Sequence, residues 1–397
     1  MNNIYNKIIE HIKNTPVINT HSHHLPDSEF VNADLHFILS NSYANWLAAP
    51  PKRGDRAGAA EYINKHRCNS YFRWIIKSLE ELYGLEMTAD NYDLIDEKLT
   101  ASHKDALYHL EILKNRCRFE KIVNERQPDP SSNLGHPDLF SPSFRCDCYF
   151  SGYLKTKPEP NGFFAYSTFE KNDIHTLSEY LDEVKKAISK KKNDGCKALK
   201  CAIAYERPLD FDEYNLSKAE KALNNESASE DEINAFGNIV MRTLCEAAAE
   251  NGLPFQIHTG MGQLKDTNPI KLLKIIEENQ NTKFQLLHGG FPWFSDTYAL
   301  LHNYKNVWSD TCWIPYLSTS AAKDYIKSAL EVSDAFRLTW GCDTWTSEDA
   351  LGALFSMEHT LSLALSEMVI DGAFETEYAF YIADRIMYEN GKQLFDL

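Results

Sequence analysis

Short apolar segments alternate along the chain with longer stretches of helical periodicity. Eight segments combine apolar residues with polar or turn-forming boundaries, which is typical of buried strands. They lie at 16–21, 119–125, 144–150, 196–205, 253–258, 283–288, 306–310 and 336–343. Because the later segments alternate with helices, as βα units do, the pattern predicts an α/β fold, a (β/α)8 TIM-like barrel. In such barrels the chemistry lies at the carboxyl ends of the strands.

Helix start and stop signals fill the intervals between these segments. Ser229 and Glu232 form a capping box, and apolar residues at helical spacing follow it. Asn251-Gly252 supplies the stop signal. Further helices are expected from near residue 173, over 350–370 and over 377–395.

Residues 26–118 interrupt the alternation, because they contain no clear strand. Within them, "YFRWIIKSLEELYGLE" (71–86) places its apolar residues on one helical face. No linker rich in Pro, Gly or Ser bounds the segment. We therefore expect one domain over 1–397, with 26–118 as a helical insertion that caps the barrel mouth.

The charge, hydropathy and cysteine content of the chain disfavour some classes of partner and compartment. The 397 residues carry 57 acidic and 41 basic side chains, a formal net charge of -16, which disfavours nucleic acid and anionic membrane surfaces. No apolar stretch approaches the roughly 20 residues that span a bilayer. The N-terminus has the pattern of an amphipathic helix rather than a signal peptide. Nine scattered cysteines favour reduced thiols, and so a cytoplasmic protein.

Histidines gather where the first strand ends. In "NTHSHHLP" (19–26), His21 and His23 are two residues apart, so on a strand they point to the same side, and His24 points to the other. Two neutral imidazoles on one face form half a site for a metal such as zinc. A solvated loop is the alternative for this motif taken alone.

Later strands end in the same kinds of residue. The fifth, sixth and eighth segments end in His258, His288 and Asp343, and the fourth contains Lys200. Glycines follow His288 and clear space for a ligand. Since the strand ends of a barrel meet at one mouth, these residues together predict a metal site.

This order of residues resembles the amidohydrolase superfamily. Within it, "PFQIHTGMGQLKDTNPIKLLKII", "FQLLHGGFPW" and the closing "ADRIMYENGKQLFDL" are similar to the family related to the amidohydrolase domains fused to glutamine synthetase in some fungi and plants. The likeness covers about residues 15–25 and 190–397. The helical insertion resembles that of the uronate isomerases, which share the superfamily.

The resemblance implies roles for the strand-end residues. His21, His23, His258 and Asp343 would bind a divalent ion, with zinc expected first and manganese, iron or nickel as alternatives. Such an ion lowers the pKa of bound water to about 7. Asp343 would accept the water proton and pass it to the leaving group, and His288 would polarise the substrate.

Four further residues are candidates with a structural alternative each. Lys200 would bridge two metals as a carboxylated lysine, contact a substrate anion, or form a structural ion pair. Arg207 would clamp a substrate carboxylate, unless it forms a surface ion pair. Trp313 and Trp345 would wall the pocket, unless they only pack at the barrel rim.

The sequence therefore predicts a metal-dependent hydrolase of an amide, ester or lactone bond in a small, anionic molecule. Non-oxidative decarboxylation and isomerisation of the uronate-isomerase type are alternatives on the same metal site. A non-catalytic barrel protein is the alternative from another class. A small-molecule substrate and a homo-oligomer are the expected partners.

Overall fold

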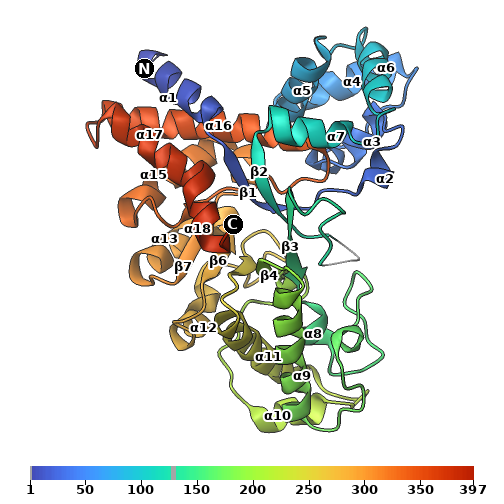
Figure 1. Ribbon diagram of the computed structural model, residues 1–397, viewed down its shortest axis with the longest axis vertical. Coiled ribbons are helices and arrows are strands. Elements are labelled where there is room, and N and C mark those ends of the chain that lie inside the picture. Colours follow the sequence, from blue (N-terminus) through green and yellow to red (C-terminus); the bar gives the residue numbers. More distant parts are fainter. Residues whose placement is uncertain (1, 127–130) are drawn as a thin grey trace.

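Eight parallel strands follow one another in chain order around one sheet in the computed structural model, which describes residues 2–126 and 131–397 (Figure 1). They are β1 (Val17–Ser22), β2 (Phe119–Asn124), β3 (Phe140–Arg145), β4 (Ala198–Cys201), β5 (Phe255–His258), β6 (Phe284–Leu287), β7 (Val307–Asp310) and β8 (Leu338–Thr339). Backbone hydrogen bonds join the first strand to the segment that leaves the last one, from Thr20 N to Trp340 O at 3.2 Å and from Asp343 N to His21 O at 3.0 Å. The sheet thus curls into the predicted barrel.

Each predicted strand segment overlaps one observed strand, and the third differs most in its bounds. The sequence predicts 144–150, whereas β3 is Phe140–Arg145 and Cys148–Ser151 forms the helical turn α8. The side chain of Asp147 accepts hydrogen bonds from Arg145 and from the backbone N–H of Ala202. The polar residue therefore ends the strand, and the pairing of "FSPSFR" with β2 and β4 outweighs its weak strand propensity.

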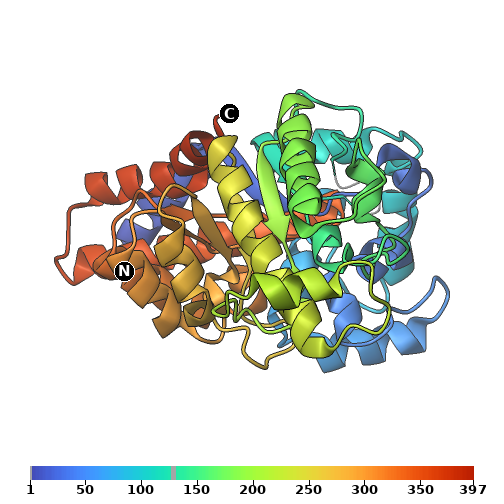
Figure 2. The ribbon, with the colours of Figure 1, turned by 90° about the horizontal axis from the view of Figure 1, so that it is seen from below.

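Helices surround the sheet. They are α1 (Asn2–Asn14), α9 (Leu177–Asn193), α10 (Leu216–Ala222), α11 (Glu230–Glu250), α12 (Leu273–Glu278), α13 (Phe294–Asn303), α14 (Ile314–Leu317), α15 (Thr319–Val332), α16 (Ser347–Ile370), α17 (Thr376–Asp384) and α18 (Asn390–Phe395). The helices α9 and α11 pack against each other at the lower end of the view in Figure 1, and Figure 2 shows them side by side from below. The capping box of Ser229 and Glu232 is confirmed at the start of α11. A π-helical turn at Arg385–Glu389 divides the predicted helix 377–395.

Between β1 and β2 the chain forms six α-helices and two short helical turns, Tyr43–Trp46 and Ile112–Arg116. The α-helices are α2 (Asp27–Phe30), α3 (Leu35–Ser40), α4 (Arg56–His66), α5 (Ser70–Tyr83), α6 (Tyr92–Ser102) and α7 (Tyr108–Glu111). They gather at the upper right of Figure 1, where α5 packs on α16. Glu348 of α16 joins the two parts, because its carboxylate lies 2.7 Å from His103 Nε2 and accepts the Tyr83 hydroxyl at 2.8 Å.

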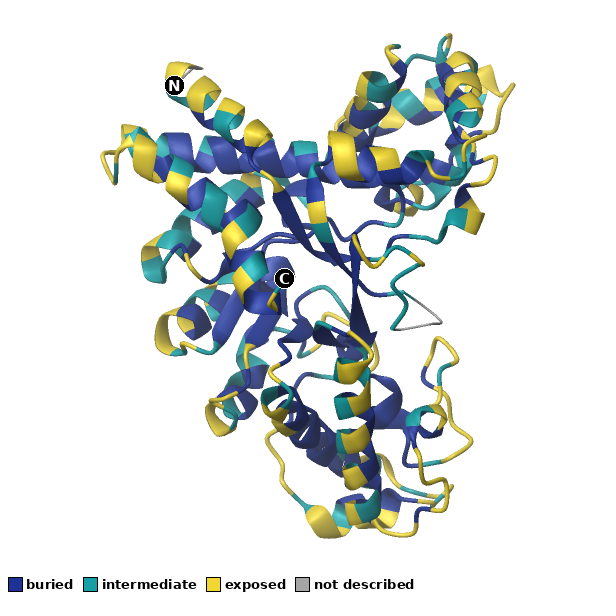
Figure 3. Ribbon diagram, in the orientation of Figure 1, coloured by how far each residue is buried: buried dark blue, intermediate teal, exposed yellow. Residues whose placement is uncertain are grey.

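The barrel interior is buried but not wholly apolar. All residues of β1, β4, β5, β6 and β7 are buried (Figure 3). Inside, Gln256 donates to Gln285 at 2.9 Å, and Gln285 donates to Asp310 at 2.7 Å. This polar layer supports the strand ends that carry the site. No described helix has the length and apolar character needed to cross a membrane.

Candidate active site

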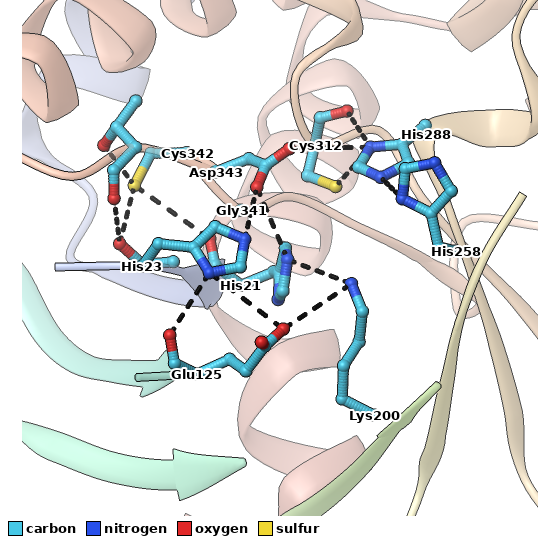
Figure 4. A network of polar contacts seen from close by, with 12 residues as sticks. His21, His23, Glu125, Lys200, His258, His288, Cys312, Gly341, Cys342 and Asp343 are labelled. Atoms are coloured by element: carbon cyan, nitrogen blue, oxygen red, sulfur yellow. Dashed lines mark hydrogen bonds and ion pairs between the residues drawn. The ribbon is translucent and has the colours of Figure 1, made fainter. Parts of the chain in front are cut away.

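The predicted strand-end residues meet in one pocket at the carboxyl ends of the strands. Its volume is about 300 Å³. The side chains that line it come from most of the strand ends and from the insertion: His21, His23, Tyr43, Trp46, Glu125, Arg126, Arg145, Asn161, Lys200, Ala202, Tyr205, His258, His288, Asp343 and Trp345. Figure 4 shows Asp343 at the centre, with His21 and His23 on one side and His288, His258 and Cys312 on the other.

A close approach of two strands brings Asp343 to His21. A Cβ atom at Gly341 would lie 2.4 Å from the backbone nitrogen of His21, so only glycine fits there. Asp343 has a positive φ of 56°, which turns its side chain back toward the first strand. Its Oδ1 lies 3.4 Å from His21 Nε2 and 3.2 Å from His23 Nε2.

The tautomer of His23 follows from its neighbour. Nδ1 of His23 lies 3.2 Å from the carbonyl oxygen of Glu125, which can only accept a hydrogen bond. Nδ1 therefore carries the ring proton, and in the neutral ring Nε2 directs its lone pair at the carboxylate of Asp343. A lone pair and a carboxylate oxygen repel each other at 3.2 Å unless a proton or a cation lies between them.

Charge and burial act in opposite directions on these groups. Burial, followed by the nearby ammonium of Lys200, lowers the pKa of His21 to about 3. Burial also acts to lower the pKa of His23, but the carboxylates of Glu125 and Asp343 outweigh it and raise that pKa. Burial alone would raise the pKa of Asp343, yet its contacts with His21 and His23 hold it well below the ordinary value.

These donors fit a divalent ion. One ligand atom from each of His21, His23 and Asp343 lies within 4.8 Å of the others. Two imidazoles and a carboxylate are the donors of many catalytic zinc sites, which keep a further position open. Nδ1 of His21 is buried without a hydrogen-bond partner among the described residues. The carbonyl behind His23 is the kind of outer contact that orients a metal-binding imidazole.

Lys200 lies beside this cluster as part of an ion-pair network. Its Nζ is 3.3 Å from His21 Nε2 and 3.9 Å from the carboxylate of Glu125. Arg145 also contacts Glu125, at 3.3 Å, and Asp147, at 2.7 Å. The cations of Arg145, Lys200 and Arg126 therefore line a pocket in which Glu125 and Asp343 carry the negative charge.

His258 and His288 form a pair on the other side of Asp343. Nδ1 of His258 lies 2.9 Å from His288 Nε2, and its Nε2 lies 3.1 Å from the carbonyl oxygen of Met261. The structure thus brings His258 into the pocket but not into the group of His21, His23 and Asp343. His288 Nδ1 is 3.8 Å from Asp343 Oδ2. The role predicted for His288, to polarise the substrate, remains a prediction.

The tryptophans and Arg207 lie in different surroundings. Trp345 stacks on His23, with ring centroids 5.5 Å apart, and lines the pocket. Trp313 packs edge-on to His288 and lines an adjoining space of about 230 Å³. Arg207 does not line either space, because its guanidinium donates to Asn238 at 2.7 Å and packs over Phe211.

Several residues of the site were missed by the sequence reasoning. Glu125 directly follows β2 and Cys312 lies two residues after β7, so the strand-end rule could have found both. Arg145 ends β3, whose predicted bounds were shifted. Tyr43 donates to Asp343 Oδ2 at 2.8 Å from the insertion, and no sequence pattern signals that contact.

Two polar residues near the strand ends, His24 and Asp310, do not line the pocket. His24 points away from the pocket and contacts His109, with 2.9 Å between His24 Nε2 and His109 Nδ1. Asp310 is buried below the site, where it accepts hydrogen bonds from Thr20, Gln285 and Thr339.

Sequence comparison matches part of the chain to known proteins. Residues 215–392 match the family model described as amidohydrolase. A stretch of 150 residues is 28% identical to the protein fluG of Emericella nidulans, covering 36% of this chain and 17% of that protein. The chain therefore corresponds to only a small part of this curated relative.

Solved structures share the fold over nearly the whole chain. A uronate isomerase from Thermotoga maritima has a TM-score of 0.79 and 16% identity, covering 99% of this chain and 97% of its own. A glucuronate isomerase from Caulobacter crescentus has a TM-score of 0.78 and 15% identity, covering 99% and 94%. A candidate metal-dependent hydrolase from Lactobacillus casei has a TM-score of 0.71 and 14% identity, covering 98% and 97%. At these identities the likeness concerns the fold.

Proposed function

The chain belongs to the amidohydrolase superfamily, and from this premise we propose that it is a metal-dependent hydrolase of a small, carboxylate-bearing substrate. The observation that carries the proposal is the convergence of His21, His23 and Asp343 on one point of a pocket lined by cationic side chains. A bound divalent ion would supply Lewis acidity and activate water near neutral pH. Zinc is the first expectation, because imidazole and carboxylate donors suit it.

Asp343 has the surroundings of a proton acceptor. Its Oδ1 faces the two imidazoles, and its Oδ2 accepts a hydrogen bond from Tyr43. We assign to this carboxylate the proton of the attacking water, which it later passes to the leaving group. The hydroxyl of Tyr43 fixes the orientation of the carboxylate during both transfers.

The charge of the pocket supports an anionic substrate. Arg145, Arg126 and Lys200 line it, and a guanidinium has five N–H donors in a planar fork that suits a carboxylate. Burial of Lys200 beside Glu125 favours contact between a substrate anion and an ammonium already held in place. A volume of about 300 Å³ suits a molecule of metabolite size.

Isomerisation of a small sugar acid is a second candidate. The helical insertion favours it, because Tyr43 and Trp46 reach the pocket from the insertion. The fold likeness to solved uronate isomerases also extends over 99% of this chain, and so over the insertion. The same cationic groups would bind the sugar carboxylate.

One panel of substrates separates the reactions. Metal-loaded protein is incubated with N-acyl amino acids, lactones, carboxylate esters and hexuronates, and products are followed by NMR and mass spectrometry. Hydrolysis adds the mass of one water and breaks a bond, whereas isomerisation leaves the mass unchanged and creates a ketone carbon. Decarboxylation releases bicarbonate.

Protein with both His21→Ala and His23→Ala, purified identically, is the control for contaminating enzymes. Bond cleavage that requires the two histidines is the expected result. Turnover only of hexuronates without change of mass would replace hydrolysis by isomerisation. Purified protein that binds no divalent ion would contradict both.

A further inference from the structure

A row of polar contacts runs along the ends of β5, β6 and β7, on the side of Asp343 away from the first strand. It begins where the carbonyl of Met261 contacts His258. From His258 it passes to His288 and ends at Cys312 (Figure 4). Sγ of Cys312 lies 3.2 Å from His288 Nδ1. The side chains of His258, His288 and Cys312 are buried.

Counting protons in this row shows where a lone pair remains. Two neutral imidazoles carry two ring protons, and one of these must lie between His258 and His288. The other can go to only one end of the row. Met261 O is 3.1 Å from His258 Nε2, whereas Cys312 O is 3.4 Å from His288 Nδ1, so the shorter contact favours the proton on His258.

His288 then donates from Nε2 to His258, and its Nδ1 keeps a lone pair directed toward Cys312 and Asp343. In the absence of an ion, the thiol proton of Cys312 satisfies this lone pair as a weak donor. A thiol, an imidazole lone pair and a carboxylate thus face one another, and one ligand atom from each lies within 4.8 Å of the others.

From this geometry we propose that Cys312, His288 and Asp343 form a second cation site, suited to a divalent ion that accepts sulfur ligands, such as zinc. Asp343 would be shared with the ion held by His21 and His23. The proposal therefore rests on the proposed function through Asp343 alone, since Cys312 and His288 take no part in the first group. Lys200 is not a member, because it contacts His21 and Glu125.

The backbone supports this assignment independently of the side chains. His288, Trp313 and Asp343 have φ angles of 65°, 66° and 56°, and Trp313 directly follows Cys312. A non-glycine residue in this left-handed region is strained and persists where the surroundings require it, often at ligand sites. Three successive strand ends thus each hold a left-handed residue beside the same point.

Binding at this site would proceed by exchange of a proton for the ion. The thiol of Cys312 loses its proton to solvent as the bond from sulfur to the metal forms, and the lone pair of His288 Nδ1 forms the second bond without losing a proton. Because thiolate is a soft ligand, the site would select zinc or cobalt over magnesium or calcium.

Cobalt(II) tests the proposal, since a bond between thiolate and cobalt produces a charge-transfer band in the near ultraviolet. Chelator-treated protein is titrated with cobalt under argon, and ions per chain are counted by elemental analysis. We expect two ions per chain and a charge-transfer band that saturates with one of them. Cys312→Ser should lose the band and one ion and keep the other.

Cys342→Ser is the matched control. Cys342 is equally buried and precedes Asp343, but its sulfur contacts Asn19, Ser22 and Thr344 instead of His288. This variant should keep the band and both ions. If Cys312→Ser fails to fold, X-ray absorption of the zinc-loaded wild-type protein decides, with a sulfur neighbour at about 2.3 Å expected.

Three results would overturn the proposal. One ion per chain without a band or a sulfur neighbour would exclude the second site and leave the proposed function intact. A band that survives Cys312→Ser but disappears in Cys342→Ser would show that Cys342, and not Cys312, supplies the sulfur ligand. Protein that binds no cobalt or zinc would remove both sites together.

Discussion

The two sides of Asp343 contain similar side chains but hold them in different electrostatic states. Toward β1, His21 and His23 lie among charged groups, with Lys200 and Glu125 close by. Toward β5, β6 and β7, His258 and His288 contact each other, a carbonyl and a thiol. The first side pairs charges, and the second forms a row of neutral donors and acceptors.

The pKa values reflect this difference. On the charged side the pKa values of the two histidines shift in opposite directions. The ammonium of Lys200 adds to the effect of burial and lowers the pKa of His21, whereas the carboxylate of Glu125 opposes burial and raises the pKa of His23. On the neutral side the pKa values of both histidines are lowered, because burial is the largest influence on each. The pKa of His288 falls to about 4. The pKa of an imidazole at the barrel mouth therefore depends on its neighbours and not on residue type alone.

The largest effect is expected on the charged side. Replacing both His21 and His23 by Ala should remove the ion of the first site and abolish activity, because Asp343 alone cannot retain it. Elemental analysis and turnover measure this. His302→Ala, in an exposed part of α13, is the control and should change neither. Unchanged metal content in the double variant would mean that His21 and His23 are not ligands.

The shared carboxylate comes next. Asp343→Asn keeps one oxygen ligand but cannot take a proton at neutral pH. We expect the ion to be largely retained and kcat to fall about 10²–10⁴-fold, the usual effect of removing a positioned general base. The pH profile of kcat/KM should also lose its acidic limb. An Asn variant with normal turnover would transfer the proton role to another group, most simply His288.

Lys200 tests whether the charged side binds substrate. Lys200→Ala should leave the metal content constant and raise KM about 10- to 100-fold, as expected for the loss of one hydrogen bond from a charged group. Lys197→Ala is the matched control in the same segment, since Lys197 is directed to Asp396 O at the surface. Loss of one metal with Lys200 would instead indicate a carboxylated lysine that bridges two ions.

His258 tests the boundary between the two sides. The sequence predicts it as a ligand of the first ion, whereas the structure pairs it with His288. We expect His258→Ala to keep the first ion with unchanged affinity, because His258 contacts His288 and Met261 rather than a ligand of that ion. Affinity for the second ion should fall about 10- to 100-fold, since His258 orients its ligand His288. Complete loss of the first ion, measured by competition with a chelator, would restore His258 as a direct ligand.

Asp349 is a second buried aspartate, and its pKa shifts in the direction opposite to that of Asp343. Its replacement is expected to have the smallest effect, on the pH dependence of stability alone. Burial raises the pKa of Asp349 to about 8, although Tyr316 donates to it at 2.5 Å. A carboxyl whose pKa is higher in the folded state stabilises the fold at low pH, and this contribution is lost as pH rises from about 4 toward 8. Asp349→Asn should therefore flatten the dependence of Tm on pH in this window. An unchanged slope would contradict the raised pKa.

Much of the fold and part of the site were determined by the sequence itself. The eight strands, the helical insertion and the capping box at Ser229 follow from hydrophobic periodicity and cap chemistry, which act over a few neighbouring residues. His21, His23, Lys200, His258, His288 and Asp343 share one pocket because parallel strands in a barrel all end at the same mouth.

Which of these residues contact one another depends on the tertiary structure. The bounds of β3 depend on its pairing with two neighbours, and Arg207 is held by Asn238 rather than by the pocket. Tyr43 reaches Asp343 across 300 positions of sequence. Such contacts depend on the distances between strand ends and on the packing of the insertion, and local patterns of hydrophobicity carry no information about either.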